Sequence, residues 1–189
     1  MRVACLLLAA GASTRFGSCK QLALLDGKPL VLHALERLAP LFDENLFTVL
    51  GAAREEIRPH AARLSRVIEH PRWRDGIGSS IARGVAAIEA RLDCNGILIA
   101  LADQARLTSD DYRRLAEHFD GNRIVAAFYA GNAGVPAIFP ADQFSRLRKL
   151  NGDRGARSLL KKMRDEIVTV PMPAAVDDID TIEDLRQRV

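Results

Sequence analysis

The residues with the clearest chemical potential lie in a glycine-rich segment directly after the first apolar run of the chain. Gly11 follows the apolar residues 3–10, and Arg15 and Lys20 then place two cations in the same segment. A glycine here lets the backbone turn sharply and approach a ligand closely, while the hydroxyl of Ser13 and nearby N–H groups can donate to phosphate oxygens. The segment therefore predicts a phosphate-binding loop.

The spacing within this loop excludes two familiar phosphate-binding motifs. Residues 11–17 read Gly-Ala-Ser-Thr-Arg-Phe-Gly, which fits neither the GxGxxG pattern of dinucleotide-binding folds nor the GxxxxGK[ST] pattern of P-loops. A generic loop between a strand and a helix, with Arg and Lys on its surface, is the alternative interpretation.

Asp103 is a second chemical candidate, because it follows another buried apolar run, residues 96–102. A carboxylate at the end of such a run suits Mg²⁺, which is usually held by one or two carboxylates together with retained waters and substrate phosphates. A helix cap is the alternative role for Asp103. Asp180 is the candidate for a second metal ligand, with a solvated helix start as its alternative.

Four further side chains are candidates for substrate binding. Ser79 and Ser80 stand near the start of an expected helix, where their hydroxyls can donate to a ligand or cap the helix. Arg154 and Arg157 are suited to receive the phosphate of an acceptor, or they belong to a solvated helix face. The four histidines show no metal-ligand spacing.

The elements that must position these residues alternate between strands and helices. Strands are expected at residues 3–10, 46–50, 66–69, 96–102, 124–129, 135–139 and 167–170, with a turn at 131–134. Helices are expected at residues 29–38, 80–92, 112–119, 141–150, 154–164 and 182–188, and residues 54–64 form a charged amphipathic stretch. This alternation predicts one α/β domain over residues 1–189, a doubly wound, mainly parallel or mixed sheet with helices on both faces. In such sheets ligands bind beyond the carboxyl ends of the strands, where Gly11 and Asp103 are expected.

Composition narrows the classes of partner. The 189 residues are 48% hydrophobic and 27% charged, with a formal net charge of +3, which is typical of a folded globular protein. The absence of a long Lys/Arg block and an aromatic content of only 5% argue against nucleic acid and favour a small phosphorylated ligand. The apolar run at residues 3–10 is too short for a membrane span, and three scattered cysteines favour a reducing compartment, so we expect a cytoplasmic protein.

The pattern Leu-Ala-Ala-Gly-x-Ser-x-Arg-x-Gly-x-x-Lys at residues 8–20 resembles the signature of the MobA-like nucleotidyltransferases, a family that includes molybdenum cofactor guanylyl- and cytidylyltransferases. Residues 75–81, 101–104, 152–157 and 178–184 resemble four further family segments in the same order. The resemblance implies the Rossmann-like nucleotidyltransferase fold. It implies that the nucleotide-binding residues are Leu8, Ala9, Ala10, Gly11, Ser13, Arg15, Lys20, Gly76, Ser79, Ser80 and Asp103.

The same resemblance assigns roles to the chemical candidates. Arg15, Lys20 and Asp103 are the implied catalytic residues, and Asp103 and Asp180 are the implied ligands of Mg²⁺. Gln104, Arg154 and Arg157 are the implied acceptor-binding residues.

Ala10 and Gln104 resemble the cytidylyl branch of the family, which implies CTP as the nucleotide. The implied reaction transfers CMP from CTP to the terminal phosphate of a molybdopterin-type cofactor and releases pyrophosphate, with a molybdoenzyme or its maturation chaperone as a partner. Ala105, Val135 and Ile182 depart from the family pattern. These departures leave open a sugar or polyol phosphate as acceptor, and GTP or another nucleotide is the alternative to CTP. A non-catalytic protein that binds and delivers nucleotide or molybdenum cofactor is the alternative from another class.

Overall fold

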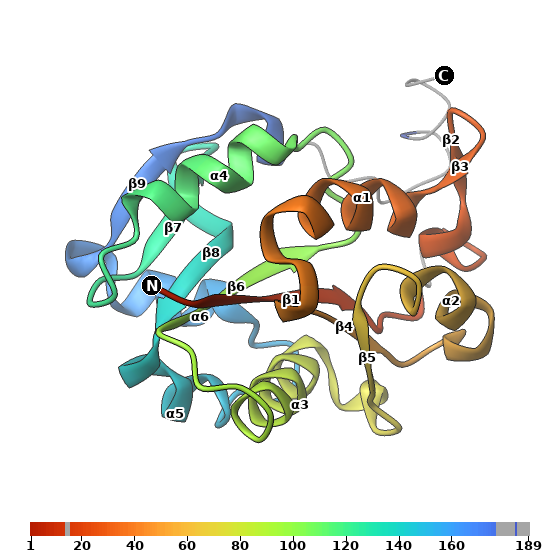
Figure 1. Ribbon diagram of the computed structural model, residues 1–189, viewed down its shortest axis with the longest axis horizontal. Coiled ribbons are helices and arrows are strands. Elements are labelled where there is room, and N and C mark those ends of the chain that lie inside the picture. The colour runs from red at the N-terminus through yellow and green to blue at the C-terminus, as the bar shows by residue number, and fades with distance from the viewer. Residues whose placement is uncertain (14–15, 177–183, 185–189) are drawn as a thin grey trace.

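The computed structural model describes residues 1–13, 16–176 and 184. Seven of the described strands form one sheet, and helices cover both of its faces (Figure 1). This confirms the predicted doubly wound α/β fold. In spatial order the strands are β5 (Arg66–Glu69), β4 (Leu46–Leu50), β1 (Val3–Ala9), β6 (Gly96–Leu101), β8 (Asn132–Pro140), β7 (Val125–Tyr129) and β9 (Val168–Pro171).

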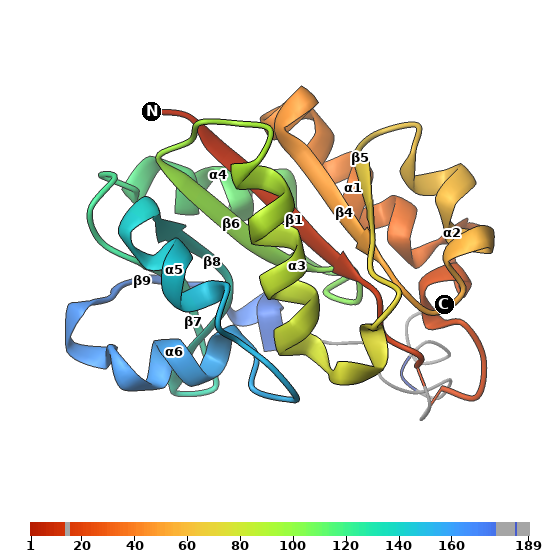
Figure 2. The same ribbon diagram turned by 90° about the horizontal axis from the view of Figure 1, so that it is seen from below.

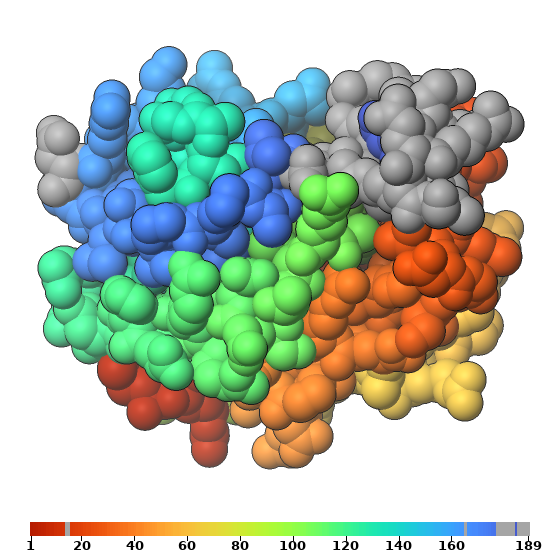
Figure 3. Space-filling view, turned by 90° about the horizontal axis from the view of Figure 1, so that it is seen from above, coloured from red at the N-terminus to blue at the C-terminus, as the bar shows by residue number. Residues whose placement is uncertain are grey.

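The helices divide into two layers on either side of the sheet (Figures 1 and 2). One layer contains α1 (Leu30–Phe42), α2 (Arg54–Ala61) and α4 (Ser109–His118), and α1 and α4 lie next to each other on the face in Figure 3. The other contains α3 (Ile77–Glu89), α5 (Phe144–Leu147) and α6 (Ala156–Lys162). A small hairpin of β2 (Leu24–Leu25) and β3 (Lys28–Pro29) precedes α1.

The continuous apolar run of β1 follows from its central position between these layers. Successive side chains of a strand point to opposite faces, so a strand covered on both faces must be apolar throughout. Cys5, Leu7 and Ala9 pack into the core on the α1 side, whereas Leu6 and Leu8 pack into the core on the α3 side. At roughly 25 cal/mol for each Å² of apolar surface removed from water, such burial on two faces is the main stabilising contribution of this strand.

Parallel pairing brings the candidate residues to one edge of the sheet. Strand β1 pairs in parallel with β4 and with β6, and Leu8 lies opposite Leu101. Gly11 and Asp103, which follow the ends of β1 and β6, therefore leave the sheet at the same edge. Both residues lie beyond the carboxyl ends of the strands, where the sequence places them, and both line one cavity there.

The turn between β7 and β8 lies earlier in the chain than the sequence predicts. The expectation that residues 131–134 separate two strands is wrong, because β8 already begins at Asn132. Ala130 and Gly131 form the turn, with φ angles of 47° and 74°. Positive φ at both central residues matches the twist of a two-residue hairpin, so the strands continue up to it. Strand β8 runs antiparallel to both neighbours, which makes the sheet mixed.

Several helix bounds also differ. Helix α3 begins at Ile77, three residues before the expected start, and Gly76 precedes it with a φ of 91°. The helix expected at residues 141–150 is a 3-10 turn at Ala141–Gln143 followed by the short α5. The helix expected at residues 182–188 lies outside the described residues. In the described part of the chain, no helix has the length and apolar character needed to cross a bilayer.

Candidate functional site

A cavity of about 480 Å³ lies at the carboxyl edge of the sheet, on the α3 side. Its floor is the end of β1, where Leu8 and Ala10 face it. One wall is the loop after β1, and the opposite wall is the segment that leads into α3. Asp103, at the end of β6, and Lys20 close the cavity between these walls.

The loop after β1 is fastened to the body of the protein at several points. Phe16 is only 4% exposed and packs with Leu25, Leu30 and Ala105 in a small apolar cluster. The N–H of Phe16 also donates to the carbonyl oxygen of Ser13 across 2.9 Å. This anchoring keeps the backbone of Gly11 and Ser13 at the cavity, although Ser13 adopts the left-handed region with a φ of 53°.

Gln21 connects the two ends of this loop from inside. It belongs to a 3-10 turn, Lys20–Leu22, and is 7% exposed. Its Nε2 donates to the carbonyl oxygen of Gly11 at 3.1 Å, and its Oε1 accepts from the hydroxyl of Ser13 at 3.2 Å and from the thiol of Cys19 at 3.3 Å. The side chain also lines the cavity.

Lys20 and Asp103 form the ion pair of the site. The Nζ atom of Lys20 lies 2.7 Å from Oδ2 of Asp103, and the side chains are 12% and 23% exposed. Partial removal from water strengthens such a pair relative to an exposed one. The pair joins residues 83 positions apart, and it holds one cation and one carboxylate beside the phosphate-binding loop.

The second carboxylate oxygen of Asp103 is the atom that best fits a metal ion. Its Oδ1 is buried and has no hydrogen-bond partner within the described ranges. A buried anionic oxygen without a partner carries a large desolvation cost, which a cation bound at that oxygen removes. The described residues contain no group of three or more acidic, His or Cys side chains arranged for a metal. Asp103 therefore suits an ion such as Mg²⁺, which takes most of its ligands from water and substrate.

The wall opposite the loop is built from closely approaching backbone. A Cβ atom on Gly76 would lie 2.4 Å from the backbone of Gly152, and one on Gly78 would lie 2.7 Å from the backbone of Asn151. The N–H of Gly78 donates to the carbonyl oxygen of Gly152 at 2.9 Å. The glycines thus let the segment around residue 152 pack directly against the start of α3, and Asp153 from this segment reaches the cavity.

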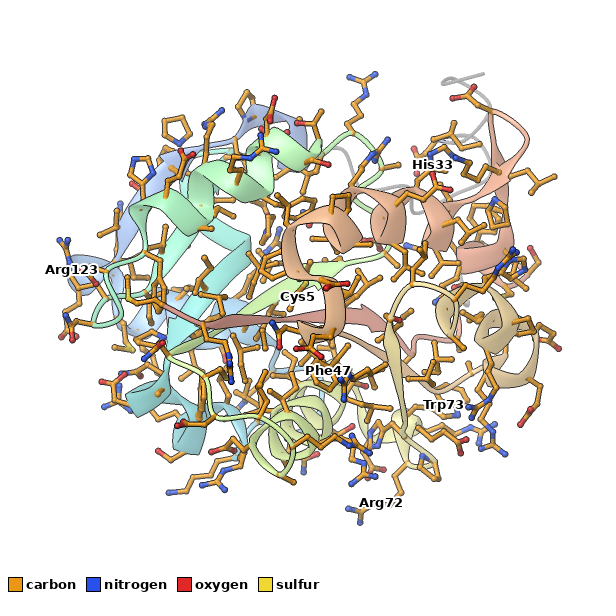
Figure 4. The ribbon with its side chains drawn as sticks, in the orientation of Figure 1. Cys5, His33, Phe47, Arg72, Trp73 and Arg123 are labelled. Carbon is orange, nitrogen blue, oxygen red and sulfur yellow. The ribbon has the colours of Figure 1, made fainter. Side chains whose placement is uncertain are left out.

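Trp73 forms the outer part of the same wall. It lies in the 3-10 turn Trp73–Asp75 between β5 and α3, where Figure 4 labels it. Gly51 makes room for it, because a Cβ there would be 2.4 Å from Cβ of Trp73. The guanidinium of Arg74 lies 4.4 Å from the centre of the indole ring. Trp73 is the single tryptophan of the chain. In the same figure Arg72, next to it, points out into solvent.

The structure gathers most of the predicted nucleotide-binding residues around this cavity. Those that line it are Leu8, Ala10, Gly11, Ser13, Lys20, Gly76, Ser80 and Asp103. Ala9 is adjacent in sequence but does not line it, because its side chain packs into the core on the α1 side. Arg15 and Asp180 lie outside the described residues, so their roles stay predictions.

Ser79 points away from the cavity, unlike its neighbour Ser80. Its hydroxyl donates to the carbonyl oxygen of Gly76 at 2.7 Å and lies 2.8 Å from Nε2 of His70. Because the one hydroxyl proton goes to the carbonyl, Nε2 of His70 must be the donor to Ser79, which a neutral imidazole can satisfy. Burial lowers the pKa of His70, with the charges of Arg83 and Arg72 acting in the same direction against Asp75, which favours that neutral form.

Three predicted acceptor-binding residues also lie away from the cavity. Gln104 is 1% exposed, and its Nε2 donates to the carbonyl oxygens of Val135 and Ala175 at 3.0 Å each. Arg157 donates to the hydroxyl of Tyr129 at 3.0 Å, and its guanidinium lies 5.7 Å from that ring. Arg154 lines a separate basic groove beside α6. Gln104 and Arg157 thus hold strands β7 and β8 and the segment after β9 together.

Sequence reasoning missed Gln21, Trp73 and Asp153 as residues of the site. Gln21 directly follows the predicted cation Lys20, and Trp73 lies three positions before the predicted Gly76, so both stand just outside the segments that the sequence singles out. Neither has a charge or a metal-binding group that would have marked it. Asp153 precedes Arg154 in a segment expected to bind an acceptor.

Comparison with known proteins identifies the class to which this fold and cavity belong. The MobA-like NTP transferase domain matches residues 5–167. The chain therefore belongs to the MobA-like NTP transferase family, as its motifs predicted.

Individual relatives carry different names. The purine catabolism protein PucB of Bacillus subtilis is 33% identical over 112 residues, which is 58% of this chain and 54% of that protein, so the chain spans about half its length. A molybdenum cofactor guanylyltransferase of Burkholderia vietnamiensis is 34% identical over 161 residues, covering 82% of this chain and 74% of the relative. The crystal structure of Rv0371C from Mycobacterium tuberculosis H37Rv in complex with manganese matches with a TM-score of 0.80 and 26% identity, covering 100% of this chain and 98% of that one.

Proposed function

We propose that this protein is a Mg²⁺-dependent nucleotidyltransferase that transfers CMP from CTP to the terminal phosphate of a molybdopterin-type cofactor and releases pyrophosphate. The observation that carries the proposal is the position of Lys20 and Asp103 beside the loop Gly11–Ser13, at the edge of the sheet where ligands of such folds bind. The unpartnered Oδ1 of Asp103 supports a divalent metal ion. The single domain over residues 1–189 and a cytoplasmic location belong to the same proposal.

The chemistry of the proposed reaction requires little proton transfer. A phosphate monoester has a second pKa near 6, so its terminal oxygen is largely ionised at neutral pH and needs no strong base. One acceptor oxygen forms a new bond to the α-phosphorus of the nucleotide, and the bond from that phosphorus to the β-phosphate oxygen breaks. Rate enhancement then comes from alignment of the two phosphates and from stabilisation of the charge on pyrophosphate.

The residues of the cavity divide these tasks. In the proposal, the N–H groups of the Gly11–Ser13 segment face the triphosphate, and Lys20, together with Arg15, neutralises the charge that builds on the leaving pyrophosphate. Asp103 would hold Mg²⁺, with Asp180 as the predicted second ligand. The bound ion supplies charge stabilisation on the phosphate oxygens. The similar structure of Rv0371C was solved in complex with manganese, which supports a divalent ion in this proposal.

The nucleotide base is the finer part of the proposal. The resemblance of Ala10 and Gln104 to the cytidylyl branch supports CTP, and Ala10 lines the cavity floor. Gln104 does not face the cavity, so any effect of Gln104 on the reaction is exerted through the strands that it holds. The guanylyltransferase name of one relative supports GTP as the competing nucleotide.

The acceptor is molybdopterin in this proposal, and the product passes to a molybdoenzyme or its maturation chaperone. The predicted contacts of Arg154 and Arg157 with the acceptor stay predictions, because Arg157 is engaged with Tyr129 and Arg154 lies in a neighbouring groove.

One turnover experiment tests donor and acceptor together. The protein is incubated with Mg²⁺, molybdopterin and either CTP, GTP or ATP, and both released pyrophosphate and the dinucleotide product are measured. We expect the highest kcat/KM with CTP. Faster turnover with GTP overturns the cytidylyl assignment, whereas nucleotide binding without turnover on molybdopterin or on a sugar phosphate supports the carrier alternative.

A further inference from the structure

We propose that Gln21 is a positioning residue that holds the loop Gly11–Ser13 in its nucleotide-binding form. This inference rests on one part of the proposed function, the binding of a nucleotide in the cavity, and does not require transfer to an acceptor. Gln21 follows Lys20 at the C-terminal end of the loop. Its buried amide contacts Gly11 and Ser13 at one end of the loop and Cys19 at the other.

The orientation of this amide is fixed by its neighbours. One end faces the carbonyl oxygen of Gly11, which can only accept, and the other faces the hydroxyl of Ser13 and the thiol of Cys19, which can both donate. Rotating the amide by half a turn would place two oxygens against each other at Gly11. The donors and acceptors therefore define a single arrangement in which every amide contact is satisfied.

This arrangement determines what Ser13 can do. A hydroxyl has one proton, and in this structure that proton points to Oε1 of Gln21. Ser13 is therefore part of the fastening of the loop, and the triphosphate is left to the backbone N–H groups and to Lys20. The left-handed backbone of Ser13, with a φ of 53°, is a conformation that surrounding contacts must maintain, and Gln21 provides one of them.

The energetic role of Gln21 is to order the loop before the nucleotide arrives. A loop that must be ordered on binding lowers affinity, because part of the binding free energy is spent on the lost conformational freedom. Removing the amide while keeping its volume should weaken nucleotide binding by about ten-fold, which corresponds to about 1.4 kcal/mol.

The chain offers a matched control for this substitution. Gln21 and Gln143 are both 7% exposed, and both lie in 3-10 turns. The amide of Gln143 contacts Asp142 and Arg146, far in the sequence from the loop and outside the cavity. The comparison of Gln21→Met with Gln143→Met therefore separates an effect on the loop from the general cost of losing a buried amide.

Two intrinsic reporters make the test independent of turnover. Trp73 is the single tryptophan and lines the cavity, so its fluorescence reports nucleotide binding. Cys19 is part-buried while Cys5 and Cys94 are buried, so alkylation of Cys19 by iodoacetamide, measured by peptide mass spectrometry, reports opening of the loop. Burial also raises the pKa of Cys19, which keeps alkylation slow while the loop is closed.

The experiment titrates wild type, Gln21→Met and Gln143→Met with the Mg²⁺ complexes of CTP and GTP, and measures alkylation of Cys19 without nucleotide. We expect Gln21→Met to bind about ten-fold more weakly and to expose Cys19 several-fold faster, with a Tm close to that of Gln143→Met. Equal alkylation rates in the two variants overturn the proposal, and so does nucleotide affinity in Gln21→Met within two-fold of wild type.

A Gln21→Glu variant adds a second arm. Its carboxylate can still accept from Ser13 and Cys19 but cannot donate to Gly11, and its charge opposes phosphate. Because a carboxylate oxygen then faces the carbonyl oxygen of Gly11, we expect faster alkylation of Cys19 than in wild type together with weaker nucleotide binding, and alkylation as slow as in wild type overturns the role of the donated hydrogen bond. Failure of the transferase assay with normal nucleotide affinity would leave this result intact, so the fate of the proposed reaction and that of Gln21 are measured separately.

Discussion

The two halves of the sheet use their polar side chains in opposite ways. Beyond β1 and β6, Lys20, Gln21 and Asp103 surround a cavity and leave a buried carboxylate oxygen without a partner in the described part of the chain. Around β7, β8 and β9, Nε2 of Gln104 and the guanidinium of Arg157 donate to carbonyl oxygens and a tyrosine hydroxyl of the protein itself, while Oε1 of Gln104 is a neutral buried oxygen without a partner in the described residues. The first half is arranged to receive a charged ligand, and the second is arranged to hold its own strands together.

This difference follows from the course of the chain. The first half is the parallel part, where consecutive strands end at one edge and loops gather there. The second half contains strand β8, which runs antiparallel to its neighbours β6 and β7. Side-chain hydrogen bonds of Gln104 and Arg157 connect β8, β7 and the segment after β9. Polar residues at the end of a parallel strand therefore face the ligand cavity, whereas those beside the antiparallel strand bind to the protein itself.

The sharpest test of this contrast is Asp103→Asn. Loss of the carboxylate removes the proposed metal ligand and the partner of Lys20, so we expect kcat to fall by about 10²–10³ while nucleotide binding partly survives. Asp153→Asn, on the opposite wall of the same cavity, is the matched variant and should have a much smaller effect. Steady-state pyrophosphate release measures both. Unchanged turnover in Asp103→Asn would refute the assignment of the metal to this residue.

A second comparison uses two glycines of the cavity. Gly76 has a φ of 91° and no room for a Cβ, whereas a Cβ atom on Gly11 would meet nothing within 4 Å. Gly76→Ala should lower the free energy of unfolding by about 1–3 kcal/mol, because the strained backbone and the contact with Gly152 must change. Gly11→Ala should leave stability nearly unchanged and weaken nucleotide binding, because its methyl group enters the phosphate-binding space. Denaturant titration and Trp73 fluorescence measure the two effects, and a Gly76→Ala protein as stable as wild type would contradict this account.

A third comparison concerns the two arginines predicted to contact the acceptor. Arg157→Gln removes the hydrogen bond and the ring contact with Tyr129, so we expect a loss of about 1 kcal/mol in the free energy of unfolding. Arg154→Gln should leave stability unchanged, since its exposed side chain lies in the basic groove, and it should raise KM only for the acceptor. If Arg157→Gln raised the KM for the acceptor without a change in stability, Arg157 would bind the acceptor, and the structural role assigned to the second half of the sheet would be wrong.

The smallest expected effect concerns pH. The pKa of His70 is lowered in the folded protein, mainly by burial, so the unfolded chain binds a proton at a higher pH than the folded one. Stability should therefore rise with pH between the lowered folded pKa and the unfolded value of about 6.5, and fall as pH drops through that window. His70→Gln keeps an amide donor for Ser79 without titrating, and its denaturation midpoint should depend less on pH. Equal pH dependence of the two proteins would exclude this role of His70.

Some features of this protein were determined by the sequence alone. The apolar runs of β1 and β6 require cover on both faces, and a glycine after such a run requires a loop at the edge of the sheet. Residue type and spacing were therefore enough to predict the fold class, the loop after β1 and the position of Asp103 at the same edge of the sheet. These properties depend on the burial pattern of short segments, which can be recognised without knowing their neighbours.

Other features depended on the tertiary structure. The 2.7 Å contact between Lys20 and Asp103 forms only because β1 and β6 are adjacent, and the opposite orientations of Ser79 and Ser80 depend on the start of α3 at Ile77. The role of Gln21 depends on the position of its amide between Gly11, Ser13 and Cys19. The direction and partners of a polar side chain are set by groups distant in sequence, which residue type and spacing do not encode.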